Sequence, residues 1–190
     1  MNKNNVLVII DMQYAFETAH NNQTQGHIVK MIKLFRREHL PIINVVYKLH
    51  YRSMRMMSKI KRALTGYHFL YELTKRDDDG GVELYNLCER EGLKGYNFYF
   101  TGVNINCCVG HTACTLANHY PSSEVFVVHN CCNGTCREED LPKYFLGGRF
   151  EIENDNLKLI SLRLKDIAKK QTERQNVVVS PIRADAAFKA

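Results

Sequence analysis

Two adjacent cysteines, Cys107 and Cys108, lie where a predicted strand gives way to a predicted helix, within FTGVNINCCVGHTACTLANHY at residues 100–120. A cysteine in the first turn of a helix is surrounded by backbone N–H groups without intrahelical partners, and the helix dipole favours its thiolate. The same N–H groups can stabilise the oxyanion that forms when a thiolate attacks an acyl carbon. This helix start could therefore supply both a nucleophile, Cys108, and an oxyanion hole.

Polar side chains also follow the other predicted strands. Asp11 ends the first strand, Lys48 and His50 follow the second, and His129 and Asn130 follow the fourth. In an open parallel sheet the ligand site lies outside the carboxyl ends of the strands, so these side chains are candidates for one site. Each also has a simpler interpretation, because a strand-end Asp often caps a turn and a strand-end His is often a packed surface residue.

The elements that must position these side chains are short hydrophobic strands alternating with amphipathic helices. The strands are nearly continuous in hydrophobicity, as strands covered on both faces must be, and are predicted at residues 5–10, 41–47, 96–102, 123–129 and 156–161. Helices are predicted at residues 27–39, 81–92, 107–120 and 162–170. This alternation predicts an α/β fold, a three-layer α/β/α sandwich with a central, mostly parallel sheet of Rossmann-like topology.

Length and composition favour one domain. The chain has 190 residues, 45% of them hydrophobic, which is enough for one full core. We expect a domain at residues 1–170 and a tail at 171–190 that is either disordered or an arm contacting a neighbouring subunit of a homo-oligomer. No membrane-spanning run or signal peptide is evident, so a cytoplasmic location is expected. The odd count of seven cysteines fits reduced thiols better than a disulfide framework.

The net charge of +6 raises the question of a nucleic-acid partner. Much of this charge falls in RSMRMMSKIKRAL, residues 52–64, which predicts an amphipathic helix with a basic face opposite a methionine-rich face. The basic residues are Arg52, Arg55, Lys59 and Arg62. A solvated cationic face is the favoured interpretation, and a nucleic-acid partner is not expected, since no zinc-finger or RNA-binding motif accompanies it.

Three segments resemble the isochorismatase-like cysteine hydrolases. VLVIIDMQYAF resembles their opening strand and catalytic aspartate, which falls on Asp11, and TGVNINCCVGHTA resembles their nucleophile segment. Counting from Gly102 places the family's cysteine on Cys108 and makes Cys107 a variable neighbour. The family's lysine falls on Lys75 in ELTKRDDDGGVELYNL. The three motifs occur in the family's order, over roughly residues 5 to 165.

The resemblance implies a catalytic triad of Asp11, Lys75 and Cys108. In such a triad the lysine lowers the pKa of the thiol, and the aspartate takes the thiol proton and returns it to a leaving amine. The resemblance also implies a cis peptide bond between Val103 and Asn104. The backbone N–H groups of Asn104 and Cys108 would then form the oxyanion hole.

The expected lining of the substrate pocket includes Gln13 and Phe16. The segment after the second strand departs from the pattern of some family members. Nicotinamidase-like members carry an Asp-x-His metal motif after the second strand, but VVYKLHYRS offers His50 without a matching Asp. We therefore predict no metal and no cofactor. The cysteines of CCNGTC lack the spacing and the fourth partner of a zinc site and are expected to pack in the core or a loop: Cys131, Cys132 and Cys136.

These observations predict a cysteine hydrolase that cleaves a small amide or related C–N bond of a small-molecule substrate through a thioester on Cys108. One alternative is a catalytically idle relative that binds a small molecule or a protein partner, although an intact triad argues against it. Another is an isochorismatase-type hydrolase of a vinyl ether, a reaction that does not need a cysteine nucleophile. Cys108 therefore favours C–N hydrolysis.

Overall fold

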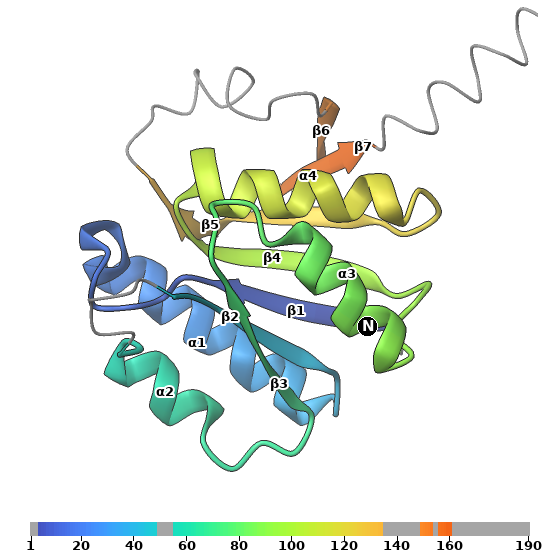
Figure 1. Cartoon of the computed structure of the whole chain (residues 1–190). Helices are drawn as coiled ribbons and strands as arrows, with labels where there is room; N and C mark the ends of the chain where they lie inside the picture. Colours follow the sequence, from blue (N-terminus) through green and yellow to red (C-terminus); the bar gives the residue numbers. More distant parts are fainter. Residues whose placement is uncertain (1–3, 49–54, 135–148, 154–155, 161–190) are drawn as a thin grey trace, which may run out of the picture.

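A single seven-stranded sheet organises the chain, whose computed structural model describes residues 4–48, 55–134, 149–153 and 156–160 (Figure 1). The strands are β1 (Asn5–Ile10), β2 (Ile42–Tyr47), β3 (Leu70–Lys75), β4 (Asn97–Val103), β5 (Val125–Asn133), β6 (Arg149–Glu153) and β7 (Asn156–Ile160). Their order in the sheet is β3-β2-β1-β4-β5-β7-β6. The first five are parallel, β7 is antiparallel to β5, and β6 is antiparallel to β7. The sheet is therefore mostly parallel, as predicted.

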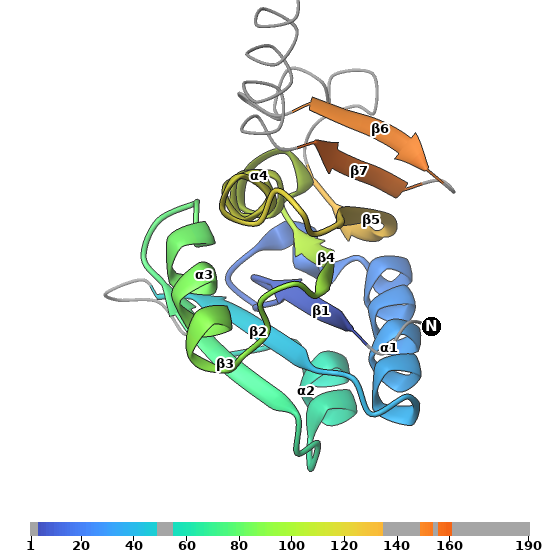
Figure 2. The ribbon, with the colours of Figure 1, turned by 90° about the vertical axis from the view of Figure 1, so that its right-hand side faces the viewer.

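Helices cover both faces of the sheet and make the predicted three layers (Figure 2). On one face lie α1 (Asn22–Arg37) and α2 (Ser58–Leu64), and on the other lie α3 (Gly81–Arg90) and α4 (Gly110–His119). Two short helical turns complete the elements, η1 (Glu17–His20) and η2 (Ile105–Val109). The strand order reverses between β1 and β4, and in doubly wound sheets the crevice for a ligand opens at this reversal.

The central strand β1 separates two hydrophobic cores. Its even-numbered residues Val6, Val8 and Ile10 pack toward α3 and α4, whereas Leu7 and Ile9 pack toward α1 and α2. Successive side chains of a strand point to opposite faces, so a strand covered on both faces must be hydrophobic throughout. This burial fixes the register of β1 and therefore the position of its carboxyl end.

Two strands of the sheet were absent from the sequence prediction, β3 and β6. β3 is an edge strand in which Glu72 and Thr74 are exposed and only Lys75 is fully buried. A strand with one solvent-exposed face lacks the continuous hydrophobicity that identifies the central strands in the sequence. The predicted last strand is confirmed as β7, but it runs antiparallel to β5.

The predicted amphipathic helix at residues 52–64 is wrong at residues 55–57 and is confirmed from Ser58 onward. The helix α2 begins only at Ser58, and residues 55–57 are extended; residues 52–54 lie outside the described residues. The backbone of this segment bonds instead to the loop after β1: Met57 donates to the carbonyl of Met12, and Tyr14 donates to that of Arg55, both at 2.9 Å. These tertiary hydrogen bonds override the local helical pattern.

The start of α1 also differs from the prediction, by five residues. Asn21 is its N-cap, and the side-chain oxygen accepts hydrogen bonds from the backbone N–H groups of Gln23 and Thr24 at 2.9 Å. The predicted helix at 162–170 and the tail at 171–190 lie outside the described residues, so the oligomer-contacting arm stays a prediction. Among the described helices, none combines the length and hydrophobicity that a membrane crossing requires.

Gly102 allows β4 to approach β1 closely at their carboxyl ends. Its φ is +117°, and a Cβ at this position would lie 2.0 Å from the carbonyl oxygen of Ile10. Only glycine can adopt this backbone without a clash. The residue that follows Ile10 is Asp11, so this contact places Asp11 beside the segment that carries Cys108.

We predict that Gly102→Ala lowers the free energy of unfolding by at least ~2 kcal/mol, because the added methyl group meets a backbone atom and the backbone conformation disfavours L side chains. The matched control is Gly26→Ala in α1, where an added Cβ meets nothing within 4 Å. This second change should stabilise the protein by about 0.5–1 kcal/mol. Urea denaturation of both variants tests whether Gly102→Ala lowers the free energy of unfolding and Gly26→Ala raises it. Equal stability of the two variants would show that Gly102 is not required at this position.

Candidate active site

Lys75 is a fully buried ammonium group that makes two hydrogen bonds and one ion pair. It is the last residue of β3 and has no exposed surface. Its Nζ donates to the backbone carbonyls of Asp77 and Asp78, each at 3.0 Å, and lies 3.0 Å from Oδ2 of Asp11. It also lies 5.1 Å from the centre of the Tyr47 ring. Burial alone would lower the pKa of Lys75, but the charges and hydrogen bonds of Asp11 and Cys108 together outweigh burial, and the pKa is raised.

Asp11 is the buried partner of this ion pair. It directly follows β1 with φ +53°, and its side chain has no exposed surface. Burial raises the pKa of the carboxyl above its ordinary value, and the charge of Lys75 opposes that effect. Within the described part of the chain, neither carboxylate oxygen of Asp11 receives a well-aligned hydrogen bond, and Oδ1 also lies outside the ion-pair contact that Oδ2 makes with Lys75. Oδ1 can therefore accept a proton, and the raised pKa makes it a better base than an exposed carboxylate.

The loop after β3 wraps around Lys75 and is anchored to α4. A Cβ on Gly80 would lie 2.7 Å from Cδ of Lys75, so a glycine is needed for the loop to close on the lysine. The N–H of Gly80 donates to Oγ1 of Thr112 at 3.0 Å, and the hydroxyl of Thr115 donates to Asp79 at 2.6 Å. These bonds tie the carbonyls that surround Lys75 to the helix that follows Cys108.

Cys108 is buried at the helical start after β4, 4% exposed, and it lies next to both charges of the ion pair. Burial raises the pKa of its thiol, and Asp11 raises it further, while Lys75 lowers it. The predicted effect of the lysine therefore has the right sign but is outweighed, and the pKa is well above its usual range. The structure brings Asp11, Lys75 and Cys108 together, and the raised pKa of the thiol favours its protonated form.

The backbone before Cys108 has the implied cis geometry. The peptide bond between Val103 and Asn104 is cis. The helical segment does not begin at Cys107 as a regular helix but at Ile105 as a wider π-type turn, in which the N–H groups of Cys107 and Val109 both donate to the carbonyl of Asn104 at 3.1 Å. The side chain of Asn104 accepts a hydrogen bond from the hydroxyl group of Thr18 at 2.7 Å.

The two residues expected to line the pocket have different surroundings. Phe16 lies half-buried on the wall of a recess of ≈ 560 Å³ that Asn104 and Asn133 also line. Gln13 is 1% exposed, and its amide donates to the carbonyl of Tyr47 at 3.2 Å and accepts from the N–H of Tyr47 at 2.9 Å. Gln13 thus supports the residue whose ring lies beneath the Lys75 ammonium.

The other candidates from the strand ends and cysteines lie apart from these three residues or outside the described chain. His129 and Asn130 are on β5, and the carbonyl of Asn130 bonds to the ring of His27 in α1, on the face of the sheet opposite Cys108. Cys131 belongs to the α1 and α2 core, and Cys132 packs against the other core. Lys48 is exposed, whereas His50 and Cys136 lie outside the described residues.

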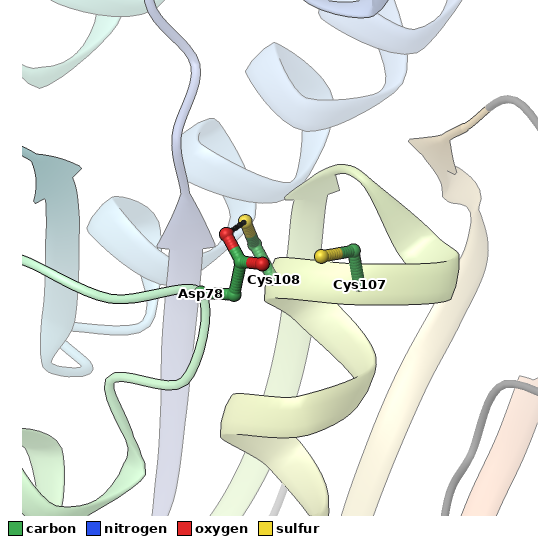
Figure 3. Close-up of side chains that lie close together, drawn as sticks. All are labelled: Asp78, Cys107 and Cys108. Atoms are coloured by element: carbon green, nitrogen blue, oxygen red, sulfur yellow. Dashed lines mark hydrogen bonds between the residues drawn. The ribbon is translucent and has the colours of Figure 1, made fainter.

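One residue at the site was missed at the sequence level, Asp78. Its Oδ1 accepts a hydrogen bond from the Cys108 thiol at 3.8 Å, and the Cys107 thiol lies beside the same carboxylate (Figure 3). The run of three aspartates after Lys75 was the available signal. The path of the loop around Lys75 decides which of the three faces the cysteines.

Comparison with known proteins identifies the fold. No family model and no curated sequence matches the chain. Among solved structures, the nicotinamidase of Staphylococcus aureus matches with a TM-score of 0.62 at 17% identity, over 76% of this chain and 92% of its own. N-carbamoylsarcosine amidase of Thermoplasma acidophilum matches with a TM-score of 0.58 at 22% identity, over 74% and 90%. An isochorismatase family protein matches with a TM-score of 0.54 at 18% identity, over 62% and 75%. The fold is therefore isochorismatase-like.

We predict that Lys75→Met and Asp11→Asn each destabilise the protein by about 3–5 kcal/mol, because each leaves one buried charge or polar group without its partner. The double variant should lose clearly less than the sum of the two. Urea denaturation of the four proteins measures this coupling.

The matched control is the exposed ion pair of Arg90 and Glu91, whose atoms lie 2.8 Å apart. Arg90→Met should change the free energy of unfolding by less than about 0.5 kcal/mol, because solvent screens this pair. Losses that simply add in the double variant would show that Lys75 and Asp11 do not depend on each other.

Proposed function

We propose that this protein is a cysteine hydrolase that cleaves a small amide or related C–N bond through a thioester on Cys108. The observation that carries the proposal is the buried pair of Asp11 and Lys75 beside the Cys108 thiol, at the carboxyl ends of β1, β3 and β4. Two of the structures that share the fold are named as amidases, which supports the same class of reaction.

The first step forms the acyl-enzyme. Because the Cys108 thiol is protonated at rest, its proton must pass to Asp11 as the sulfur attacks the amide carbon. The raised pKa of Asp11 suits this transfer, since a carboxylate with an ordinary pKa would be a weaker proton acceptor. The N–H groups of Asn104 and Cys108 are the proposed donors to the oxyanion, as the family resemblance implies.

Collapse of the tetrahedral intermediate breaks the C–N bond. Asp11, now carrying the thiol proton, gives it to the leaving nitrogen, and the acyl group remains on Cys108 as a thioester. Water then attacks the thioester, with Asp11 accepting a proton from it, and the thiolate that leaves is reprotonated. The net reaction converts an amide and water into a carboxylic acid and an amine, without a metal or cofactor.

Lys75 has a supporting part in this scheme. Its ammonium group stabilises the Asp11 carboxylate at rest and lowers the pKa of the thiol, so it favours the charged form of each partner. It also stabilises the negative charge that builds up on the sulfur when the thioester breaks. Three acceptors hold the ammonium in place, so no reorganisation is needed during the reaction.

We predict that incubation with a panel of small amides, followed by acid quench and intact-mass measurement, detects an acyl adduct on Cys108. Cys108→Ser should abolish the thioester, and Asp11→Asn should lower kcat by about 10²–10⁴-fold, because general acid–base transfer is lost. Only variants whose thermal unfolding lies above the assay temperature enter the comparison.

The control is Cys88→Ala, a buried cysteine of α3 that should leave turnover intact. Amide turnover that survives in Cys108→Ala would refute the proposed nucleophile. Turnover of a vinyl ether that is indifferent to Cys108 would instead favour the isochorismatase-type reaction. Binding without turnover in the unaltered protein would favour an idle relative.

A further inference from the structure

Three potential metal-ligand atoms lie close together beside the ion pair. The proposed reaction does not use them as a group. A carboxylate oxygen of Asp78 and the sulfurs of Cys107 and Cys108 all lie within 4.8 Å of one another. They come from two segments, the loop after β3 and the η2 turn after β4 (Figure 3). The mechanism uses Cys108 alone, so Asp78 and Cys107 form an unexplained addition to the nucleophile.

Contacts within the group show that these side chains face one another. The thiol of Cys108 donates to Oδ1 of Asp78 at 3.8 Å. The sulfur of Cys107 lies within 4.8 Å of the same carboxylate and of the Cys108 sulfur. Adjacent residues of a regular helix point in different directions. Here the η2 turn is wider than a regular helix, and the loop brings one carboxylate within reach of both sulfurs.

We propose that Asp78, Cys107 and Cys108 bind a thiophilic divalent cation such as Zn²⁺ or Cd²⁺. Two thiolates and one carboxylate are ligands that Zn²⁺ takes in tetrahedral sites, with the fourth position left for water. Bond lengths of this kind place the ligand atoms about 3.5–3.8 Å apart. Side-chain rotations would therefore have to shorten the separations by about 1.3 Å at most, starting from the 4.8 Å limit.

Accessibility and charge are compatible with binding from solvent. Asp78 is exposed and Cys107 is half-buried, so a cation reaches them before it reaches the buried Cys108. The positive charge of Lys75 is balanced by Asp11 at 3.0 Å, which leaves the ion pair neutral overall. Binding converts two thiols to thiolates and releases two protons to solvent, with no change in oxidation state. A single carboxylate is too little for Mg²⁺ or Ca²⁺, which require oxygen ligands, so the site is selective for thiophilic cations.

Occupation of this site would block the nucleophile. A sulfur bound to the cation can no longer attack an amide carbon, so the cation would act as a reversible inhibitor rather than as a cofactor. Inhibition rests on the proposed function, whereas binding does not. The two claims can therefore fail separately.

The binding test is a Cd²⁺ titration of the full chain after removal of metals with a chelator, followed by the ultraviolet thiolate-to-cadmium absorption and by calorimetry. We expect one equivalent per chain and no displacement by excess Mg²⁺. Cys107→Ala and Cys107→Ser should each weaken binding at least tenfold, and Asp78→Asn should weaken it several-fold. Circular dichroism checks that each variant is folded.

Matched controls separate this site from other ligands of the chain. Asp77→Asn changes the neighbouring aspartate but keeps the backbone carbonyl that faces Lys75, and it should leave the Cd²⁺ affinity unchanged. Cys132→Ala should also leave it unchanged, because the half-buried Cys132 thiol faces the carbonyl of Phe100 instead. Cd²⁺ binding that survives both Cys107 variants, or that is lost in Cys132→Ala instead, would overturn the proposal.

The activity arm distinguishes the two proposals. Zn²⁺ should inhibit amide hydrolysis at the concentrations at which it binds, and Cys107→Ala should shift this inhibition at least tenfold. Specific Cd²⁺ binding in a protein that hydrolyses no amide would overturn the proposed function and leave the cation site standing. Amide hydrolysis combined with unaltered Cd²⁺ binding in Cys107→Ala would overturn the cation site and leave the proposed function standing.

Discussion

The buried ion pair of Lys75 and Asp11 is the main constraint on the carboxyl-terminal edge of the parallel strands. Each charge would lose several kcal/mol of solvation on burial, and their mutual attraction offsets more of this loss when the ammonium also finds hydrogen-bond acceptors. The lysine meets that condition through two backbone carbonyls, which the loop can supply only by folding back over the end of β3. The position of this loop is therefore a consequence of burying the lysine.

The ion pair also bears on the proposed reaction, in which a buried cysteine acts as the nucleophile without being a thiolate at rest. Asp11 and Lys75 shift the pKa of the Cys108 thiol in opposite directions, and burial adds to the effect of Asp11. In the proposed reaction the thiol therefore stays protonated until a substrate arrives and Asp11 takes the proton. A protonated thiol is also less prone to oxidation and alkylation than a thiolate. The arrangement therefore combines low reactivity at rest with a nearby base.

The central strands could be predicted from the sequence because burial on both faces leaves a continuous hydrophobic run, as in β1. Lys75 could not be found in this way, since it ends an edge strand with exposed polar residues, and only the family resemblance singled it out. The roles of Asp78 and Cys107 were out of reach for a different reason. They depend on the π-type turn and on the bonds of the loop to Thr112 and Thr115, which are tertiary contacts without a local pattern.

The cation site and the ion pair are linked through the same loop. Asp78 supplies its backbone carbonyl to Lys75 and its side chain to Cys108, so the loop conformation that satisfies the ammonium also holds a carboxylate over the Cys108 thiol. With the carboxylate held there, only the residue before Cys108 decides whether a second sulfur completes the group. A cysteine at that position completes the proposed cation ligands around Cys108 while leaving the ion pair unchanged. Sensitivity to thiophilic cations is thus a property that one side chain, Cys107, can add to this site without altering the proposed reaction.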